Sequence, residues 1–281
     1  MRTKRWIMVV LLVGTLAAWA DNTGTDPAQK YAWSENAGWA NAWSASHAVT
    51  VHYYEGTGGW LSGHLWGENI GWIVMGSAGG GPYPNDTANN WGVNLATHGD
   101  LSGYAWGENV GWINFGNAQC DAAINPVNGD FSGHAWGENI GWLKFKGAAP
   151  AYGVRTLAFD TQTHGTPNWW LDSHDVNESY DAGDGVPAWR KYVMDTDPNV
   201  DGDYLRMTAV SGVPTGTVMA FTPASTRRYY TLTRTFDLTG GGWSNVPGQV
   251  AIQYGTPGEK TMQDTNTAES AFYIVEVAVA P

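Results

Sequence analysis

Short apolar runs with a period of two recur through the first half of the chain. Residues 92–95 and 123–127 are two such runs, and each leads through a glycine-containing turn into the next apolar stretch. Further runs at 72–75, 112–115 and 142–145 carry apolar residues at their first, second and fourth positions. This alternation predicts β-strands of about 5–6 residues. We therefore expect repeating units of a few short strands joined by tight turns.

One phrase of the form Trp-Gly-Glu-Asn-Ile-Gly-Trp is repeated almost letter for letter between these runs. With its leading residues it occupies 61–72, 101–112 and 131–142, and a degenerate first copy lies at 31–39. The first tryptophans of the four copies are Trp33, Trp66, Trp106 and Trp136. Their spacing of 33, 40 and 30 residues indicates a stacked or radial repeat. We expect an all-β, tryptophan-rich repeat domain, built as a β-solenoid or stacked meander, with a propeller-like arrangement as the alternative.

Each phrase is typical of a hairpin whose turn is Gly-Glu-Asn. Asparagine tolerates the left-handed conformation, and its amide can bond nearby backbone. Two tryptophans flank the turn, and a glutamate lies at its apex. The candidate ligand-binding residues are accordingly Trp33, Glu35, Trp66, Glu68, Asn69, Trp106, Glu108, Asn109, Trp136, Glu138 and Asn139.

Three interpretations of this set stay open. In the first, the tryptophans form the core, and glutamate and asparagine satisfy the backbone of the turn. In the second, exposed indole rings and polar side chains form platforms for glycans, since aromatic faces suit sugar rings and carboxylates bond hydroxyls. Catalysis is disfavoured, because a glycosidase needs two carboxylates in different environments and repeated turns supply equivalent ones.

The middle of the chain predicts two short helices separated by an acidic loop. Pro167 precedes an apolar stretch at 168–171, and the second helix is expected at 187–193, because proline suits the start of a helix. Oxygen-bearing side chains on alternate residues, with glycines for sharp turns, are what calcium requires of a loop. The candidate calcium ligands are Asp184, Asp195, Asp197, Asn199, Asp201 and Asp203. A solvated acidic linker is the alternative.

From residue 205 onward the pattern is again typical of strands. Apolar or aromatic runs at 204–207, 217–221, 228–232 and 272–277 are separated by glycine and proline. Strands at this spacing predict a small β-sandwich.

Composition and charge limit the possible binding partners of the protein and indicate where in or outside the cell it functions. The net charge is −12, which disfavours binding to nucleic acid or to anionic lipid. A positive start, an apolar stretch and Ala18-Trp19-Ala20 at residues 1–20 are typical of an export signal, and the apolar stretch is too short to span a bilayer. Cys120 is the only cysteine, so no disulfide can form within the chain. No nucleophile elbow or metal-binding histidine pair is found.

The repeated phrase resembles a repeat of exported bacterial proteins, Trp-Ser/Gly-Glu-Asn-x-Gly-Trp-Ile-Asn-Phe. The resemblance covers about residues 31–147 and implies an exported repeat protein, without implying an activity. Arg-x-Tyr, Trp243 and Phe272-Tyr273 at the end of the chain resemble modules that close many exported proteins of environmental bacteria.

The acidic loop resembles the calcium repeats of dockerin-like and thrombospondin-type proteins. Asp184-Gly185, Trp189, Tyr192 and Thr196-Asp197-Pro198 match that pattern. Two positions depart from it, since Ala182 replaces an acid and Lys191 replaces the closing glutamate. The second change removes two ligand oxygens and adds a positive charge.

Taken together, the sequence predicts four segments. They are an export signal at 1–20, a repeat domain at 21–150, a helical acidic-loop connector at 151–204 and a β-sandwich at 205–281. We expect an exported, non-enzymatic structural or adhesive protein of the cell surface or extracellular matrix. A carbohydrate-binding module is the alternative and a glycoside-active enzyme the third possibility. Expected partners are glycans or other surface proteins, with no nucleic acid and no membrane insertion after removal of the signal.

Overall fold

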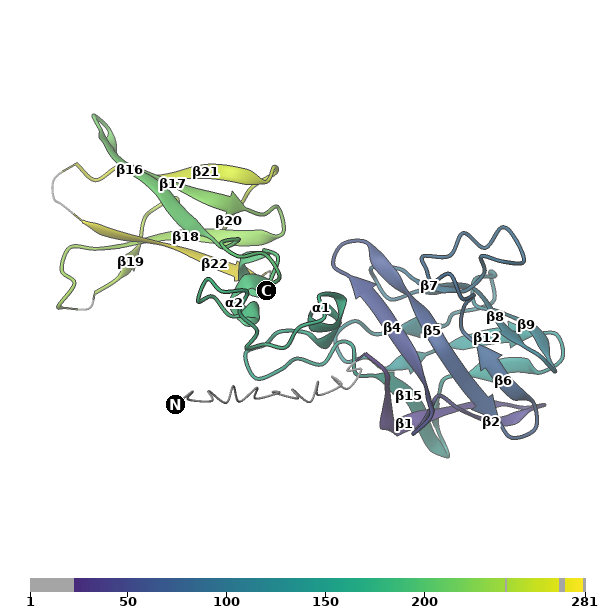
Figure 1. Cartoon of the computed structure of the whole chain (residues 1–281). Coiled ribbons are helices and arrows are strands. Elements are labelled where there is room, and N and C mark those ends of the chain that lie inside the picture. The colour runs from purple at the N-terminus through teal and green to yellow at the C-terminus, as the bar shows by residue number, and fades with distance from the viewer. Residues whose placement is uncertain (1–22, 241, 268–270, 280–281) are drawn as a thin grey trace, which may run out of the picture.

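The computed structural model describes residues 23–240, 242–267 and 271–279, so the predicted export signal lies outside the described residues. Across these residues the chain forms 22 strands and two short helices, which confirms the predicted all-β class. Figure 1 shows two β-rich bodies with the helices between them.

The four phrases form four antiparallel hairpins. They are β1 (Thr25–Ser34) with β2 (Gly38–Asn41), β5 (Gly58–Gly67) with β6 (Gly71–Val74), β8 (Leu101–Gly107) with β9 (Gly111–Asn114), and β12 (His134–Gly137) with β13 (Gly141–Lys144). Neighbouring hairpins pair side to side, β2 with β5, β6 with β8, and β9 with β12. The last hairpin pairs with the first through β13 and β1, so these eight strands close into a ring.

This closure differs from the solenoid or stacked meander that we expected. An open stack leaves its first and last units apart, whereas here the first and fourth copies are hydrogen-bonded neighbours. The propeller-like alternative also fails, because each copy adds one hairpin to a shared sheet and forms no separate blade. The physical reason is that every hairpin has two unpaired edges, and pairing them edge to edge around a circle satisfies them all.

A second tier of strands continues the ring on one side. In it the first halves of β1, β5 and β8 pair with β15 (Ala151–Thr156), β4 (His47–Tyr54) and β7 (Val93–Leu95). The strands β10 (Ala123–Ile124) and β11 (Phe131–Ser132) pair with each other. Single bridges, namely Gly24–Thr50, Asp100–Ala123 and Asp130–Arg155, join the remaining neighbours. Two more short strands, β3 (Trp43–Ser44) and β14 (Lys146–Ala148), pair with β4 and β15.

A glycine marks the point where three of the copies pass from one tier to the other. Gly63, Gly103 and Gly133 have φ angles of 80°, 87° and 70°. A Cβ atom at these positions would lie 1.9, 2.2 and 2.0 Å from a backbone carbonyl oxygen. Glycine is therefore required here by conformation and by the close approach of the neighbouring chain.

Small and aliphatic side chains fill the ring. The inward-facing cross-strand pairs are Ala32–Ala40, Leu65–Ile73, Ala105–Ile113 and Ala135–Leu143, and each of these side chains is at most 2% exposed. An eight-stranded ring encloses an interior just wide enough for such side chains. The tryptophans of the phrase occupy the alternate positions and face outward. The interpretation in which they form the core is therefore wrong.

The two predicted helices are present between the β-rich bodies. α1 (Asn168–Ser173) follows Pro167 and α2 (Ala188–Met194) follows Pro187, in agreement with the proline signals. Trp169, Trp170, Leu171, Ala188 and Tyr192 are buried in the same hydrophobic cluster as the ring interior. The helices thus pack as part of the repeat body.

The C-terminal body consists of two antiparallel sheets. One contains β16 (Arg206–Val213), β17 (Gly216–Ala224) and β21 (Gly258–Asp264); the other contains β18 (Arg228–Thr235), β19 (Ser244–Asn245), β20 (Ile252–Gln253) and β22 (Phe272–Val279). Buried side chains from both sheets, among them Met219, Phe221, Tyr230, Leu232 and Met262, form one core. This is the arrangement that a sandwich requires.

Candidate functional site

Each hairpin of the ring carries a pair of tryptophans on its outer surface. The pairs are Trp33–Trp39, Trp66–Trp72, Trp106–Trp112 and Trp136–Trp142, directly opposite in the strand register. Their ring centroids lie 4.7, 4.6, 4.7 and 4.9 Å apart in edge-to-face geometry. This is a favourable aromatic arrangement, and it stabilises the hairpin while leaving part of each ring in contact with solvent.

A third aromatic side chain extends each pair. Tyr31, His64, Tyr104 and His134 contact the second tryptophan of their own hairpin, at centroid distances of 6.1, 5.7, 6.0 and 5.9 Å. The next neighbour differs between copies, because the connecting loops differ. Tyr152 lies 5.0 Å from Trp39, His47 lies 4.7 Å from Trp72, and Trp91 lies 5.2 Å from Trp112.

The asparagines of the phrase serve the fold. The side-chain amides of Asn69, Asn109 and Asn139 donate to the carbonyl oxygens of Ala37, Ile70 and Val110, at 3.1, 3.2 and 3.0 Å. Each bond therefore links a turn to the preceding hairpin. The circle is completed by the Ser34 hydroxyl, which donates to the Ile140 carbonyl at 2.6 Å. These asparagines are thus structural members of the predicted ligand-binding set.

The glutamates of the phrase point away from the ring. Glu35, Glu68, Glu108 and Glu138 are all exposed at the turn apices. Of the predicted ligand-binding residues, the tryptophans and glutamates are therefore accessible, and the asparagine amides are occupied. The structure distributes these residues around the ring and does not gather all four copies at one place.

Two adjoining hollows flank the first hairpin, one toward the second copy and one toward the fourth, and the β14–β15 hairpin borders both. The first has a volume of about 450 Å³ and is lined by Tyr31, Trp39, Asn41, Trp66, Glu68, Pro150, Ala151 and Tyr152. The second, of about 640 Å³, is lined by Trp33, Glu35, Trp39, Lys144, Gly147, Ala148, Ala149, Pro150 and Tyr152. Both volumes are within the range of small-molecule sites. We call the two hollows together the seam groove.

The β14–β15 hairpin forms one wall of the seam groove. Pro150 in its turn and Tyr152 on β15 line both hollows together with Trp39. Trp39 is 41% exposed, and the edge of one ring meets the face of the other at the Trp39–Tyr152 contact. Burial raises the pKa of Tyr152, so its hydroxyl stays protonated and can donate a hydrogen bond. The sequence prediction included Trp33, Glu35, Trp66 and Glu68 but missed Trp39 and Tyr152.

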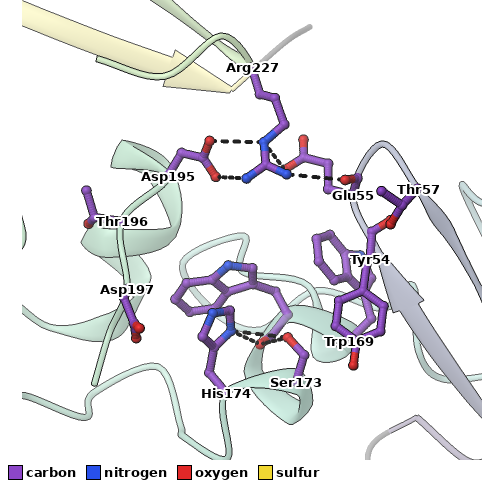
Figure 2. A pocket seen from close by; sticks show the side chains of 11 residues that line it. Tyr54, Glu55, Thr57, Trp169, Ser173, His174, Asp195, Thr196, Asp197 and Arg227 are labelled. Atoms are coloured by element: carbon purple, nitrogen blue, oxygen red, sulfur yellow. Dashed lines mark hydrogen bonds and ion pairs between the residues drawn. The ribbon is translucent and has the colours of Figure 1, made fainter. Parts of the chain in front are cut away.

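A separate pocket of about 450 Å³ lies at the junction of the repeat body, the helices and the C-terminal body (Figure 2). Its lining includes Tyr54, Trp170, Ser173, His174 and Arg227. Figure 2 shows the Arg227 guanidinium between Asp195 and Glu55, and Arg227 Nε donates to Asp195 at 3.0 Å. This contact ties the C-terminal body to the end of α2.

The serine and histidine of this junction pocket do not form a nucleophile and base. His174 Nδ1 lies 2.8 Å from the Trp170 carbonyl oxygen, which can only accept, so Nδ1 carries the proton. Ser173 Oγ donates to the same carbonyl at 2.9 Å. His174 Nδ1 therefore cannot take the Ser173 proton, and Asp195 is engaged by Arg227. Ser173 Oγ also lies 3.1 Å from His174 Nδ1. With this nitrogen bonded to the carbonyl and Asp195 bonded to Arg227, the three groups nevertheless lack the connections of a Ser-His-Asp triad.

The side chains predicted to bind calcium together contact different groups of the protein. Asp184 Oδ2 pairs with Lys191 Nζ at 2.7 Å, and this bond, with backbone donors, lowers the pKa of Asp184 to about 2. Asp195 binds Arg227, and Asp203 accepts from the Asp197 backbone amide at 2.9 Å. The Asp197 carboxylate accepts from the Asn199 backbone amide at 2.9 Å.

Asn199 donates to the His174 carbonyl at 2.9 Å, and Asp201 is exposed. Among the residues that the structure describes, no group of three or more His, Cys, Asp or Glu side chains is placed to hold a metal ion. The residues present in this loop thus do not fit a calcium site.

Cys120 is half-buried, and its thiol donates to the Asn114 carbonyl at 3.1 Å. Burial raises its pKa, so the thiol is not activated as a nucleophile. Within the described part of the chain, no helix is long and apolar enough to cross a membrane. Comparison with protein-family models, curated proteins and solved structures finds no match to this chain.

Proposed function

We propose that this protein is an exported, non-enzymatic adhesion protein that binds neutral glycans in the seam groove. The observation that carries the proposal is the exposure of the tryptophans around two adjoining hollows. Trp39 and Trp66 are 41% and 36% exposed, although large aromatic side chains are usually buried. The export signal predicted at 1–20 supports a place outside the cytoplasm.

The composition of the groove supports a sugar ligand. Indole and phenol rings offer flat apolar faces for the C–H surface of a pyranose. Glu35, Glu68 and Asn41 offer acceptors for hydroxyl groups, and the Tyr152 hydroxyl offers a donor. A few polar groups among aromatic walls are typical of small-molecule sites.

Charge favours a neutral glycan over an acidic one. The groove contains two exposed carboxylates, Glu35 and Glu68, against one ammonium, Lys144. The whole chain carries a net charge of −12, so a uronic acid or sulfated sugar meets repulsion both locally and at long range.

The position of the groove supports one principal site, although the phrase occurs four times. Both hollows use Pro150 and Tyr152 of the β14–β15 hairpin, which follows the fourth copy only. The tryptophans that do not line the groove have other neighbours, such as Trp91 beside Trp112. Their main role is then to stabilise the hairpins by edge-to-face contact.

A glycan-array screen with two matched variants tests the proposal. Trp39 and Trp112 occupy the same position in the first and third copies, and both are about two-fifths exposed, at 41% and 43%. We expect the wild-type protein to bind neutral oligosaccharides and Trp39→Ala to lose about tenfold or more in affinity, as a central aromatic contact requires. Trp112→Ala should bind as the wild type does.

Two results would contradict the proposal. One is an array on which the folded wild-type protein retains no glycan. The other is equal weakening by Trp39→Ala and Trp112→Ala, which would show that binding does not depend on the seam groove.

A further inference from the structure

A buried lysine of α2 lies between the acidic residues that precede this helix and those that follow it. Lys191, on α2, is 0% exposed, and its ammonium has two oxygen partners. Nζ lies 2.7 Å from Asp184 Oδ2 and 2.7 Å from the Val200 carbonyl oxygen. A carboxylate and a backbone carbonyl are also the ligand types that a calcium loop offers its ion.

The ammonium connects the two ends of the loop. Asp184 accepts hydrogen bonds from the backbone amides of Val186 at 2.9 Å and Gly202 at 2.8 Å. Lys191 then joins Asp184 to the Val200 carbonyl. The stretches around 184–186 and 200–202 are therefore held against α2 by one positive charge. In a metal-binding loop, the ion makes connections of this kind.

We propose that the Lys191 ammonium takes the place of the cation that the loop sequence predicts, so that the loop closes without metal. Lys191 stands where the closing glutamate of a calcium loop is expected. Its side chain reaches inward and neutralises Asp184, which would otherwise be a buried, unpaired carboxylate. A second cation at Asp184 would meet this ammonium, and like charges at such a distance repel.

The contacts of the other acids support the same proposal. Asp195 is bound by Arg227 from the C-terminal body, and Asp203 by the backbone amide of Asp197. Apart from the exposed Asp201, the acids of the loop thus have partners within the protein, and the function of the loop is to fix α2. That helix supplies Tyr192 to the core and carbonyl oxygens to Arg228.

Thermal unfolding of the full chain tests whether the loop needs metal. We expect the wild-type melting temperature to be the same with millimolar calcium and with excess chelator. Terbium titration, with emission sensitised by tryptophan, should show no saturable site. A melting temperature that falls by several degrees in chelator and recovers with calcium would overturn the proposal.

Substitutions on α2 test the role of the ammonium. Lys191→Met keeps the length of the side chain and leaves Asp184 unpaired, so we expect the melting temperature to fall by about 6 °C or more. Arg190→Met is the matched control, because Arg190 is the exposed neighbour on the same helix and should change it by about 2 °C at most. Equal melting of Lys191→Met and wild type would contradict the proposal.

The Lys191→Glu variant tests whether the ammonium excludes calcium. It restores the carboxylate of the calcium pattern and removes the competing ammonium. The proposal predicts that calcium raises the melting temperature of Lys191→Glu and leaves that of the wild type unchanged. An equal response of the two proteins to calcium would show that Lys191 does not exclude the ion. If the variants do not fold, the wild-type measurements with calcium and chelator still decide.

Discussion

The ring of hairpins and the joint that carries the C-terminal body are held together in different ways. The ring uses strand pairing, aliphatic side chains and amide bonds such as Asn109 to the Ile70 carbonyl. The joint uses fully buried cations, Lys191 and Arg228, against carboxylates and carbonyls. Contacts between neighbouring hairpins of the ring can depend on strand pairing and side-chain packing alone, since every copy presents the same surface to the next. A contact that occurs once gains specificity from charges that are costly to leave unpaired.

The largest expected effect is in the interior of the ring. Phe115 is 1% exposed, directly after β9, and contacts Phe145 at a centroid distance of 5.8 Å. We expect Phe115→Ala to lower the free energy of unfolding by about 3–5 kcal/mol, because it removes a buried ring and leaves a cavity. Urea denaturation measures this value. Tyr104→Ala, on the outer face, serves as control and should cost clearly less; a reversed order would contradict the placement of the core.

The next effect concerns the joint. Arg228 Nη2 donates to the Tyr192 carbonyl at 2.9 Å and Nε to the Val193 carbonyl at 3.0 Å, while Nη1 pairs with Glu55 at 3.3 Å. We expect Arg228→Met to cost about 2–4 kcal/mol, since it removes the buried charge that pairs with Glu55 and takes one donor each from the Tyr192 and Val193 carbonyls. Its neighbour Arg227 is half-exposed, so Arg227→Met should cost about 1 kcal/mol. Equal losses in urea denaturation would mean that burial of Arg228 does not matter.

A smaller effect distinguishes two neighbouring residues of one turn. Asn109→Ala removes the bond to the preceding hairpin and should cost about 1 kcal/mol. Glu108→Ala changes an exposed side chain at the same apex and should stay within about 0.5 kcal/mol. Chemical denaturation of both variants compares them. Loss of stability only in Glu108→Ala would contradict the structural role given to asparagine.

The smallest effect is the pH dependence of the C-terminal body. Burial of Asp264 opposes its ionisation, but Arg234 at 2.5 Å and further hydrogen bonds outweigh burial and lower the pKa. A carboxyl whose folded pKa is depressed adds stability above its unfolded pKa of about 4, and this stability is lost as the pH falls further. The protection of amides from hydrogen exchange should therefore fall in β21 on acidification before it falls in the ring. Asp264→Asn should remove this difference between the two bodies, and an unchanged difference would refute the assignment.

The local structure could be predicted from the sequence because its signals are local. The Gly-Glu-Asn turn, the alternating runs and Pro167 and Pro187 each act within a few residues. Ring closure could not be predicted, because the β1–β13 pairing joins residues about a hundred positions apart and leaves no mark on the local pattern.

The outward placement of the tryptophans also could not be predicted from the sequence pattern. Alternation assigns Trp106 and Ala105 to opposite faces but does not say which face is inside. The narrow interior of an eight-stranded ring decides, because alanine and isoleucine fit there and paired indoles do not.

The divergent first copy contains a sequence signal for a contact between two of its residues. In the other copies a glycine lies against the side chain three residues later; a Cβ on Gly67 would approach Ile70 to 2.5 Å, for example. The first copy has Ser34 and Ala37 at these positions, so the larger residue is matched by a smaller partner. Ser34 then gains its bond to the Ile140 carbonyl across the seam. Paired changes of this kind indicate a contact between the two positions.

Binding in the seam groove is tested most directly by the indole N–H resonances of the phrase tryptophans. The protein is titrated with a neutral oligosaccharide selected on the array, and the signals are assigned by single substitutions. We predict that the Trp39 indole shifts in proportion to saturation and that the Trp112 indole keeps its position. Equal shifts at Trp39 and Trp112, or a Trp39 signal that does not move at saturation, would contradict the account.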